Sequence, residues 1–289
     1  MFNIFRRKHL TGVIAPDPKD PRDYQLADIQ ETKVELPEEF DLRDKMTPVG
    51  IQKWGSCTSW GTCAVKEYWD SKQYNQTINL SEKFVYHNTK KISGLWNIQG
   101  DYVVNAIKSV CKYGAPLLKD YPDTRELTWN KYVHKEPSPE VYGKAEKYKG
   151  KTYWSVGRTL NEFRSAIYQN RCPVIFGMEW YLSYNRTDKD GKLRLPVGKP
   201  VSGHALACAG WTKDKLWVKN SWGTRWGKNG YFYIPFDEFE KYNIWNARVL
   251  LDEGTKPIEG WVAVKFLRAD KYTIGTTAKT TDRKSVGEG

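Results

Sequence analysis

The chain has 289 residues, 39% of them apolar and 14% aromatic, which suffices for the core of one enzyme-sized domain or of two lobes sharing a cleft. No apolar run approaches the roughly 18 to 20 residues of a spanning helix, and residues 1–9 hold no signal-peptide core. We therefore expect no membrane span and a cytoplasmic or virion-associated protein. Lysine and arginine exceed aspartate and glutamate by 46 − 34 = 12. Because no basic stripe interleaves with aromatic residues, we expect a solvated basic surface and no nucleic-acid partner.

The cysteines and histidines indicate neither a disulfide framework nor a metal site. Five cysteines are present, an odd number, and no two form a Cys-x-x-Cys pair. Cys63, Cys111 and Cys208 fall in apolar patterns and are predicted to be small core residues. Only four histidines occur, none at ligand spacing from another, so we expect no metal and no cofactor. The pattern indicates no particular oligomeric state.

The expected divisions, in chain order, are an N-terminal arm over 1–35, a globular domain over 36–251 and a tail over 252–289. The arm is predicted to be extended, because Pro16, Pro18 and Pro21 interrupt a charged stretch that has no helical period. In the tail, the apolar stretch from Trp261 to Leu267 is expected to be a strand or a docking segment. Residues 276–289 are polar and are expected to be disordered.

Helices are predicted over 57–73, 101–113 and 160–170. In the first of them, apolar residues recur at the spacing of one helix face. The second is expected to be capped by Asp101 and to end at Gly114. The third begins with Thr159 and Glu162, which have the spacing of a capping box.

Strands are predicted over 173–180, 204–211, 216–219, 230–234 and 247–251. These segments are short, rich in aromatic and β-branched residues, and separated by glycine and charged turns. A mainly helical lobe over about 57–130, followed by a mainly β lobe over about 131–251, is an α+β arrangement. A cleft between two such lobes is a common place for an active site.

Cys57 has the surroundings of a reactive thiol. The sequence Trp-Gly-Ser leads directly into the predicted helix, so Cys57 is expected in its first turn. The partial positive charge of a helix N-terminus stabilises a thiolate and is expected to lower the pKa of Cys57. None of the other four cysteines is expected to have this environment.

His204 opens a predicted strand after a loop, and Asn220 follows the next predicted strand. A hairpin of these two strands would bring Asn220 back beside His204. An asparagine can accept a hydrogen bond from one ring nitrogen and so leave the other nitrogen aimed at the thiol. The order Cys57, His204, Asn220 thus predicts a thiol-based active site.

These segments carry a resemblance to a known family. Residues 219–231, Lys-Asn-Ser-Trp-Gly-Thr-Arg-Trp-Gly-Lys-Asn-Gly-Tyr, resemble the Asn motif of papain-like cysteine peptidases, and Gly203-His-Ala resembles their His motif. Leu36-Pro-Glu-Glu-Phe-Asp-Leu-Arg resembles the start of their mature domain, and the sequence around Asn79-Leu-Ser-Glu and Gly100 resembles segments that follow the catalytic helix. The resemblance covers roughly residues 36–251. It implies a two-lobed fold with an antiparallel, β-barrel-like second lobe and a polypeptide substrate.

The resemblance also implies catalytic roles. Cys57 would attack the scissile carbonyl, and His204 would remove the thiol proton and later protonate the leaving amine. Asn220 would orient His204. Gln52 and the backbone N–H of Cys57 would hold the oxyanion, at about 3 to 4 kcal/mol per donor.

Four further residues would line the substrate cleft. Trp222 is expected to shield the His204–Asn220 contact from water. Gly100 would pair with the substrate backbone, with Asp101 beside it, and Ala205 would border a side-chain pocket. Asp101 stands where a second glycine is usual and is expected to narrow or charge the cleft.

Several positions depart from the plant and lysosomal pattern and resemble bacterial and phage members instead. Thr58 follows the nucleophile in place of a tryptophan, and Trp54 stands where a disulfide cysteine is usual. Gln52 is one residue nearer to Cys57 than is usual. The N-terminal arm is shorter than the helical inhibitory segment of lysosomal members, so activation by removal of such a domain is not expected.

Two other functions are compatible with the sequence. The altered residues around Cys57, the tail and the basic surface are also typical of a catalytically silent scaffold that serves as a structural or binding protein, for example in a virion. Acyl or peptidyl transfer could proceed through the same thioester as hydrolysis.

Overall fold

The computed structural model describes residues 10–21, 23–28, 34–123 and 128–252, together with the backbone of two strands over 261–269 and 272–279. The helices are α1 (Cys57–Tyr74), α2 (Glu82–Ser93), α3 (Val103–Tyr113), α4 (Trp129–Val133), α5 (Pro139–Ala145) and α6 (Leu160–Asn170). The strands are β1 (Phe40–Asp41), β2 (Thr152–Ser155), β3 (Val174–Trp180), β4 (Ser202–Thr212), β5 (Lys215–Lys219), β6 (Tyr231–Pro235), β7 (Ile244–Leu251), β8 (Trp261–Ala269) and β9 (Tyr272–Lys279). None of the helices in these segments is long and apolar enough to cross a membrane.

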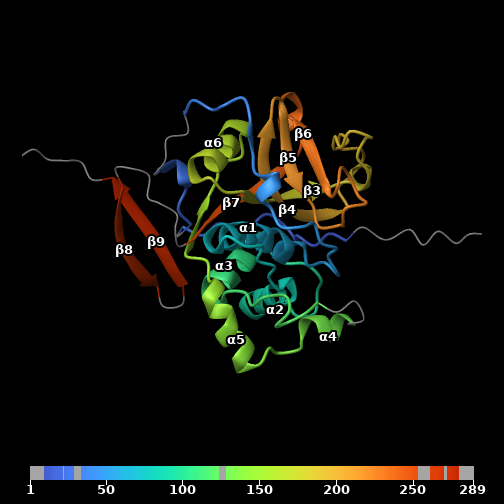
Figure 1. Ribbon diagram of the computed structural model, residues 1–289. Coiled ribbons are helices and arrows are strands. Elements are labelled where there is room, and N and C mark those ends of the chain that lie inside the picture. Colours follow the sequence, from blue (N-terminus) through green and yellow to red (C-terminus); the bar gives the residue numbers. More distant parts are fainter. Residues whose placement is uncertain are drawn as a thin grey trace, which may run out of the picture.

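Helix α1 separates two layers. Figure 1 shows the large sheet and α6 on one side of α1, and α2, α3, α4 and α5 on the other. Close packing against the sheet is possible because Gly61 presents no side chain there. A Cβ atom at Gly61 would lie 3.4 Å from both Ile175 on β3 and Leu206 on β4. The first residue of α1 is thereby held at the boundary between the lobes.

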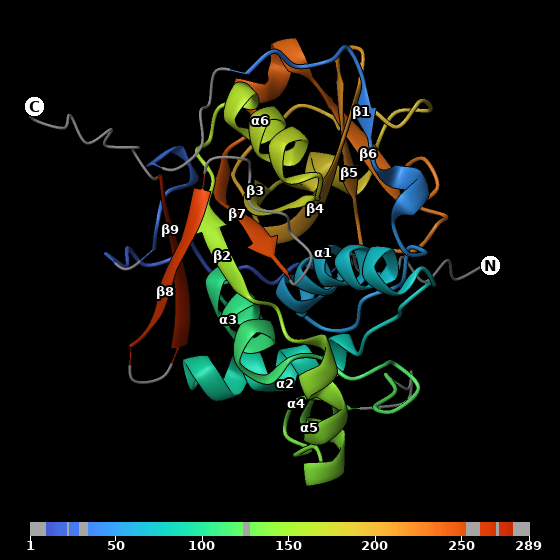
Figure 2. The ribbon, with the colours of Figure 1, turned by 60° about the vertical axis from the view of Figure 1, so that its left-hand side comes forward.

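Helices in both lobes have clear local end signals. Ser81 caps α2 by accepting a hydrogen bond from the Phe84 N–H, and Gly94 ends the helix in the left-handed conformation. Thr159 and Glu162 form the predicted capping box of α6. Figure 2 shows α2 and α3 packed together beneath α1.

The β lobe is one antiparallel sheet in the order β2-β7-β3-β4-β5-β6, with β1 added on β4. The sheet is open, so the expected closure into a barrel-like second lobe is wrong in that detail, while the α+β class is confirmed. Strand β4 is central and pairs with β3, β5 and β1. Its pairing with β5 turns the chain back from Thr212 to Lys215, as the predicted hairpin requires.

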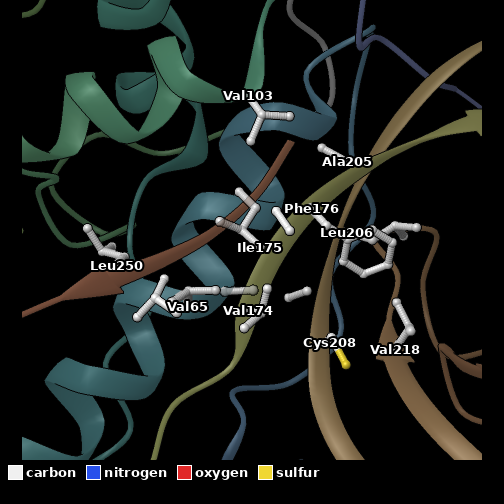
Figure 3. Packing of buried hydrophobic residues seen from close by; sticks show 14 of the residues in the cluster. Val65, Val103, Val174, Ile175, Phe176, Ala205, Leu206, Cys208, Val218 and Leu250 are labelled. Carbon is white, nitrogen blue, oxygen red and sulfur yellow. The ribbon is translucent and has the colours of Figure 1, made fainter. Parts of the chain in front are cut away.

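The core joins the two layers. Figure 3 shows Val65 of α1, Ile175 and Phe176 of β3, and Leu206 of β4 packed side by side. All of them are at most 1% exposed. Burial of such side chains stabilises a fold by about 1.5 to 3 kcal/mol each. The five cysteines are free thiols, and Cys63 and Cys208 are buried as expected, while Cys111 is half-buried.

Some predicted boundaries change. Helix α3 begins at Val103 with Tyr102 at the cap position, so the expectation that Asp101 caps it is wrong. Strand β8 includes the apolar stretch predicted in the tail, and β9 reaches Lys279. Disorder is therefore wrong for residues 276–279, and 280–289 lie outside the described residues. So do residues 1–9 of the predicted arm.

Candidate active site

Cys57 is the first residue of α1, as the sequence predicts. The first turn of α1 is closed by hydrogen bonds from the backbone N–H groups of Ser59 and Trp60 to the carbonyl of Ser56, the cap residue. The thiol lies close to the backbone of Ala205 on β4, which lowers the pKa of Cys57. Cys57 is 0% exposed.

The environment of this thiol differs from the expected one. Burial raises the pKa of Cys57 to about 12, although the nearby backbone groups of Ala205, Gly12, Cys57 and Thr58 lower it. The expectation of a lowered pKa is wrong for this arrangement. Desolvation of a buried charge outweighs the field of one helix terminus when no water reaches the sulfur.

His204 and Asn220 come together at the open end of the β4–β5 hairpin. The distance between His204 Nε2 and Asn220 Oδ1 is 2.8 Å. The same oxygen accepts a hydrogen bond from the backbone N–H of Ser221, also at 2.8 Å. It therefore acts as an acceptor, and the neutral His204 ring carries its hydrogen on Nε2. The second ring nitrogen, Nδ1, is then the basic one.

Two tryptophans enclose the His204 ring. Trp222 stacks on it with ring centroids 4.9 Å apart, and Trp180 meets it edge-on at 4.7 Å. Trp222 thus covers one face of the His204 ring, and its predicted shielding of the His204–Asn220 hydrogen bond stays a prediction. Trp180 was not predicted as a site residue. It lies on β3, and its place beside His204 follows only from the pairing of β3 with β4.

Gln52 is tied to the loop that carries Asn220. Its side-chain Oε1 accepts from Ser221 Oγ at 2.5 Å, and its Nε2 donates to the carbonyl of Trp54 at 3.2 Å. The Gln52 N–H also donates to the Ser221 carbonyl at 2.7 Å. An amide nitrogen has two hydrogens, so one of them is left for a further acceptor.

The N-terminal arm runs between the walls that the resemblance assigns to a substrate. Val13 pairs with Gly203 on one side and with Asp101 on the other. Gly203 accepts from the Val13 N–H at 2.9 Å, and Asp101 donates its N–H to the Gly12 carbonyl at 2.8 Å. The sequence gives little signal for this contact, because it is made by backbone groups.

Gly12 lies against the catalytic turn and the thiol. Its backbone lies close enough to the sulfur of Cys57 to lower the pKa of that thiol. A Cβ atom at Gly12 would be 2.1 Å from the carbonyl oxygen of Gly55, closer than any side chain permits. Just before it, the Leu10 carbonyl accepts from Trp222 Nε1 at 2.9 Å. Residues 10–14, which we call the plug, therefore cover the thiol.

The arm is fastened farther along by buried charges. Arg248 of β7 lies 3.0 Å from both Asp17 and Asp23, and the three side chains are at most 8% exposed. Tyr153 Oη donates to Asp23 at 2.8 Å, and Arg248 donates to Ser155 at 2.9 Å. We call residues 16–21 and 23–28, with these contacts, the clasp.

The two predicted wall residues behave differently from each other. Gly100 has φ +97°, and a Cβ atom there would lie 2.4 Å from the Gly12 carbonyl oxygen, so glycine keeps this wall open. Asp101 faces the plug with its backbone alone. Its carboxylate is 0% exposed and accepts from Ser93 Oγ, Asn105 Nδ2 and the Tyr102 N–H. The expectation that Asp101 narrows or charges the cleft is therefore wrong.

Ala205 is 1% exposed and lies within the core on β4, next to His204. Figure 3 shows it near Val103 of α3, at the seam between the lobes. Its predicted role at the border of a side-chain pocket stays a prediction.

The chain matches the family described as papain family cysteine protease over residues 36–250. An uncharacterised peptidase C1-like protein of Acanthamoeba polyphaga mimivirus is 27% identical over 242 residues, 76% of each chain. Papain of Carica papaya is 26% identical over 212 residues, which are 73% of this chain and 58% of papain's sequence.

Solved structures share the fold. Xylellain, a cysteine protease from Xylella fastidiosa, superposes with a TM-score of 0.74 at 24% identity, over 86% of this chain and 98% of its own. The Carica candamarcensis cysteine protease CMS1MS2, in complex with E-64, gives a TM-score of 0.55 at 23% identity, over 75% and 99%.

Proposed function

Because the chain belongs to the papain family of cysteine proteases, we propose that it hydrolyses peptide bonds through a thioester on Cys57. The observation that carries the proposal is the His204–Asn220 hydrogen bond of 2.8 Å. Ala205, the residue after His204 on β4, lies close enough to Cys57 for its backbone to lower the pKa of the thiol. The substrate class is a polypeptide.

In the proposed reaction, His204 Nδ1 takes the Cys57 proton while Nε2 stays bonded to Asn220. The thiolate attacks the scissile carbonyl, and the oxyanion is held by the Cys57 N–H and the remaining hydrogen of Gln52 Nε2. Collapse of the adduct breaks the C–N bond, and the amine leaves with the proton from His204. Water then attacks the thioester, with His204 again as base, and releases the acid and the thiol.

We further propose that the chain as described is latent, because its plug occupies the cleft. The complete burial of Cys57 and its raised pKa support this, since a thiolate is the reactive form. Removing the plug lets water reach the sulfur, which lowers the pKa of Cys57 and allows the thiolate to pair with the His204 ring.

The test compares hydrolysis of a fluorogenic peptide library by three full-length proteins: wild type, Gly12→Val, and Gly12→Val with Cys57→Ser. We expect slow or no turnover by wild type, fast turnover by Gly12→Val, and none once Cys57 is replaced. Turnover that survives Cys57→Ser would refute the thioester mechanism. No turnover by Gly12→Val, together with fast alkylation of its Cys57, would instead favour the silent scaffold, whose site is open but does not cleave.

A further inference from the structure

The segment 98–101 forms the wall that pairs with the plug, and a buried lysine stands behind it. Lys90 lies near the end of α2 and is 0% exposed. Its Nζ donates to the carbonyl of Ile98 at 2.9 Å and to the carbonyl of Gly100, and it lies 3.4 Å from Asp101 Oδ2. We propose that Lys90 is a positioning residue for substrate binding, which aims the backbone N–H of Asp101 into the cleft.

The geometry of one peptide group carries the inference. In a planar trans peptide the C=O and the N–H point in opposite directions. The Gly100 carbonyl and the Asp101 N–H belong to the same peptide group. Lys90 holds the carbonyl on the α2 side, so the N–H must point to the other side, where it donates to the Gly12 carbonyl at 2.8 Å.

Helix α2 holds the neighbouring peptide as well. The Gly100 N–H donates to Tyr86 Oη at 2.9 Å, so both backbone groups of Gly100 are bonded to side chains of α2. Gly100 itself has φ +97° and, as a glycine, has freedom to rotate. The side chains of α2 therefore restrict the rotation that Gly100 would otherwise allow in this wall of the cleft.

The charge of Lys90 is balanced locally. Burial lowers the pKa of Lys90, and the Asp101 carboxylate beside it raises it. A buried ion pair is a poor way to gain stability, since apolar residues of similar volume often do as well. A role in fixing geometry explains better why this wall has a buried lysine and an aspartate that does not face the cleft.

The same arrangement explains how the wall stays rigid without a disulfide. The cysteines are free, and Trp54 takes the position of the disulfide cysteine of plant and lysosomal members. The ion pair of Lys90 with Asp101 ties α2 to the segment before α3 by noncovalent bonds. A ligand of the cleft, whether the plug or a substrate, then meets an N–H that is already oriented.

The inference rests on the proposed peptidase function for its substrate, but the plug offers a second ligand for the test. The variant is Lys90→Met, and the matched control is Lys91→Met, which removes an exposed lysine of the same helix that bonds to Glu136. Both are placed in the full wild-type chain and in the Gly12→Val chain. One readout is the rate of Cys57 alkylation by iodoacetamide, a reagent that does not pair with the backbone of the wall. The other is KM and kcat for a peptide substrate.

In the wild-type chain we expect Lys90→Met to speed alkylation roughly tenfold, because the plug loses an oriented donor. In the Gly12→Val chain we expect unchanged alkylation, a KM raised roughly tenfold and kcat within about threefold. Lys91→Met should change none of these rates.

Equal alkylation of the Lys90→Met and Lys91→Met proteins in the wild-type chain would overturn the inference. So would a parallel loss of kcat and alkylation in the Gly12→Val chain, which indicates general damage to the fold. If the Gly12→Val chain cleaves no peptide at all, the peptidase proposal fails, while the alkylation result in the wild-type chain still decides on Lys90.

Discussion

The plug and the clasp belong to one arm but are held by different kinds of interaction. The plug is bound by backbone groups of Gly203 and Asp101 and needs a residue without a side chain at Gly12. The clasp is bound by side chains, with two buried carboxylates on one arginine. The plug thus requires only that Gly12 has no side chain, whereas the clasp requires specific charged side chains. We therefore expect substitutions in either the plug or the clasp to release the arm.

The largest effect is expected at Gly12. Replacing it with alanine or valine forces a Cβ atom onto the Gly55 carbonyl, so the plug must leave. We expect Cys57 alkylation to rise roughly 1000-fold with valine, corresponding to about 4 kcal/mol of docking free energy, and less with alanine. Mass spectrometry of iodoacetamide adducts at Cys57 gives the rate.

The control is Gly143→Ala on α5, where a Cβ atom meets nothing within 4 Å. An unchanged rate in both Gly12 variants would mean that the plug does not protect the thiol.

The second effect is expected at the clasp. Arg248→Met leaves Asp17 and Asp23 buried without their cation, and loss of one partner of such a pair costs about 3 to 5 kcal/mol. Protonation of Asp17 relieves part of this cost, so we expect alkylation of Cys57 to rise about 100-fold. The same alkylation assay measures it.

Adding Asp17→Asn and Asp23→Asn to Arg248→Met should restore protection, because no uncompensated carboxylate remains. Arg43→Met, at a half-buried pair with Asp41, serves as the control and should have no effect. Failure of the triple variant to recover would show that Arg248 supports the fold rather than the arm.

The smallest effect is expected from pH, which changes how tightly the clasp docks the arm. Burial raises the pKa of Asp17 to about 6, against the lowering effect of Arg248, so the docked arm binds this proton more tightly than the free arm does. Docking is then favoured as pH falls from about 7 towards about 4, and it weakens as pH rises through 6. By linkage, release at pH 5 should be roughly tenfold less frequent than at pH 7.

The measurement is the alkylation rate against pH, divided by that of Asp17→Asn, which cancels the titration of the thiol. A ratio that stays flat between pH 5 and pH 7, or that rises towards acid, would contradict the assignment.

The elements that are marked by a pattern in neighbouring residues could be predicted from the sequence. Helix α6 has its capping box, and the hairpin that joins His204 to Asn220 follows from two short strands and a turn. Helix α2 was missed, although Ser81 caps it, because its buried residues include lysines and an asparagine, which interrupt the apolar pattern of a helix face.

The site was predictable only in part, for a related reason. His204 and Asn220 lie in contiguous motifs, and their contact is local to one hairpin. The plug pairs with residues that lie far along the chain, through backbone groups that every residue has. The direction of the Asp101 side chain depends on Lys90, and the pKa of Cys57 depends on the plug, so neither could be inferred from neighbouring residues.

The attachment of the arm to β4 determines whether dilution of the protein can release the plug. Gly203, near the start of β4, pairs with Val13, and the Gly210–Trp211 end of the same strand pairs with β1, which follows the arm. The blocking segment is therefore joined through the rest of the arm to β1, which is held on the same strand, and its effective concentration at the thiol is of the order of millimolar. Dilution cannot release it. A free peptide with modest affinity would have to reach comparable concentrations before it competed.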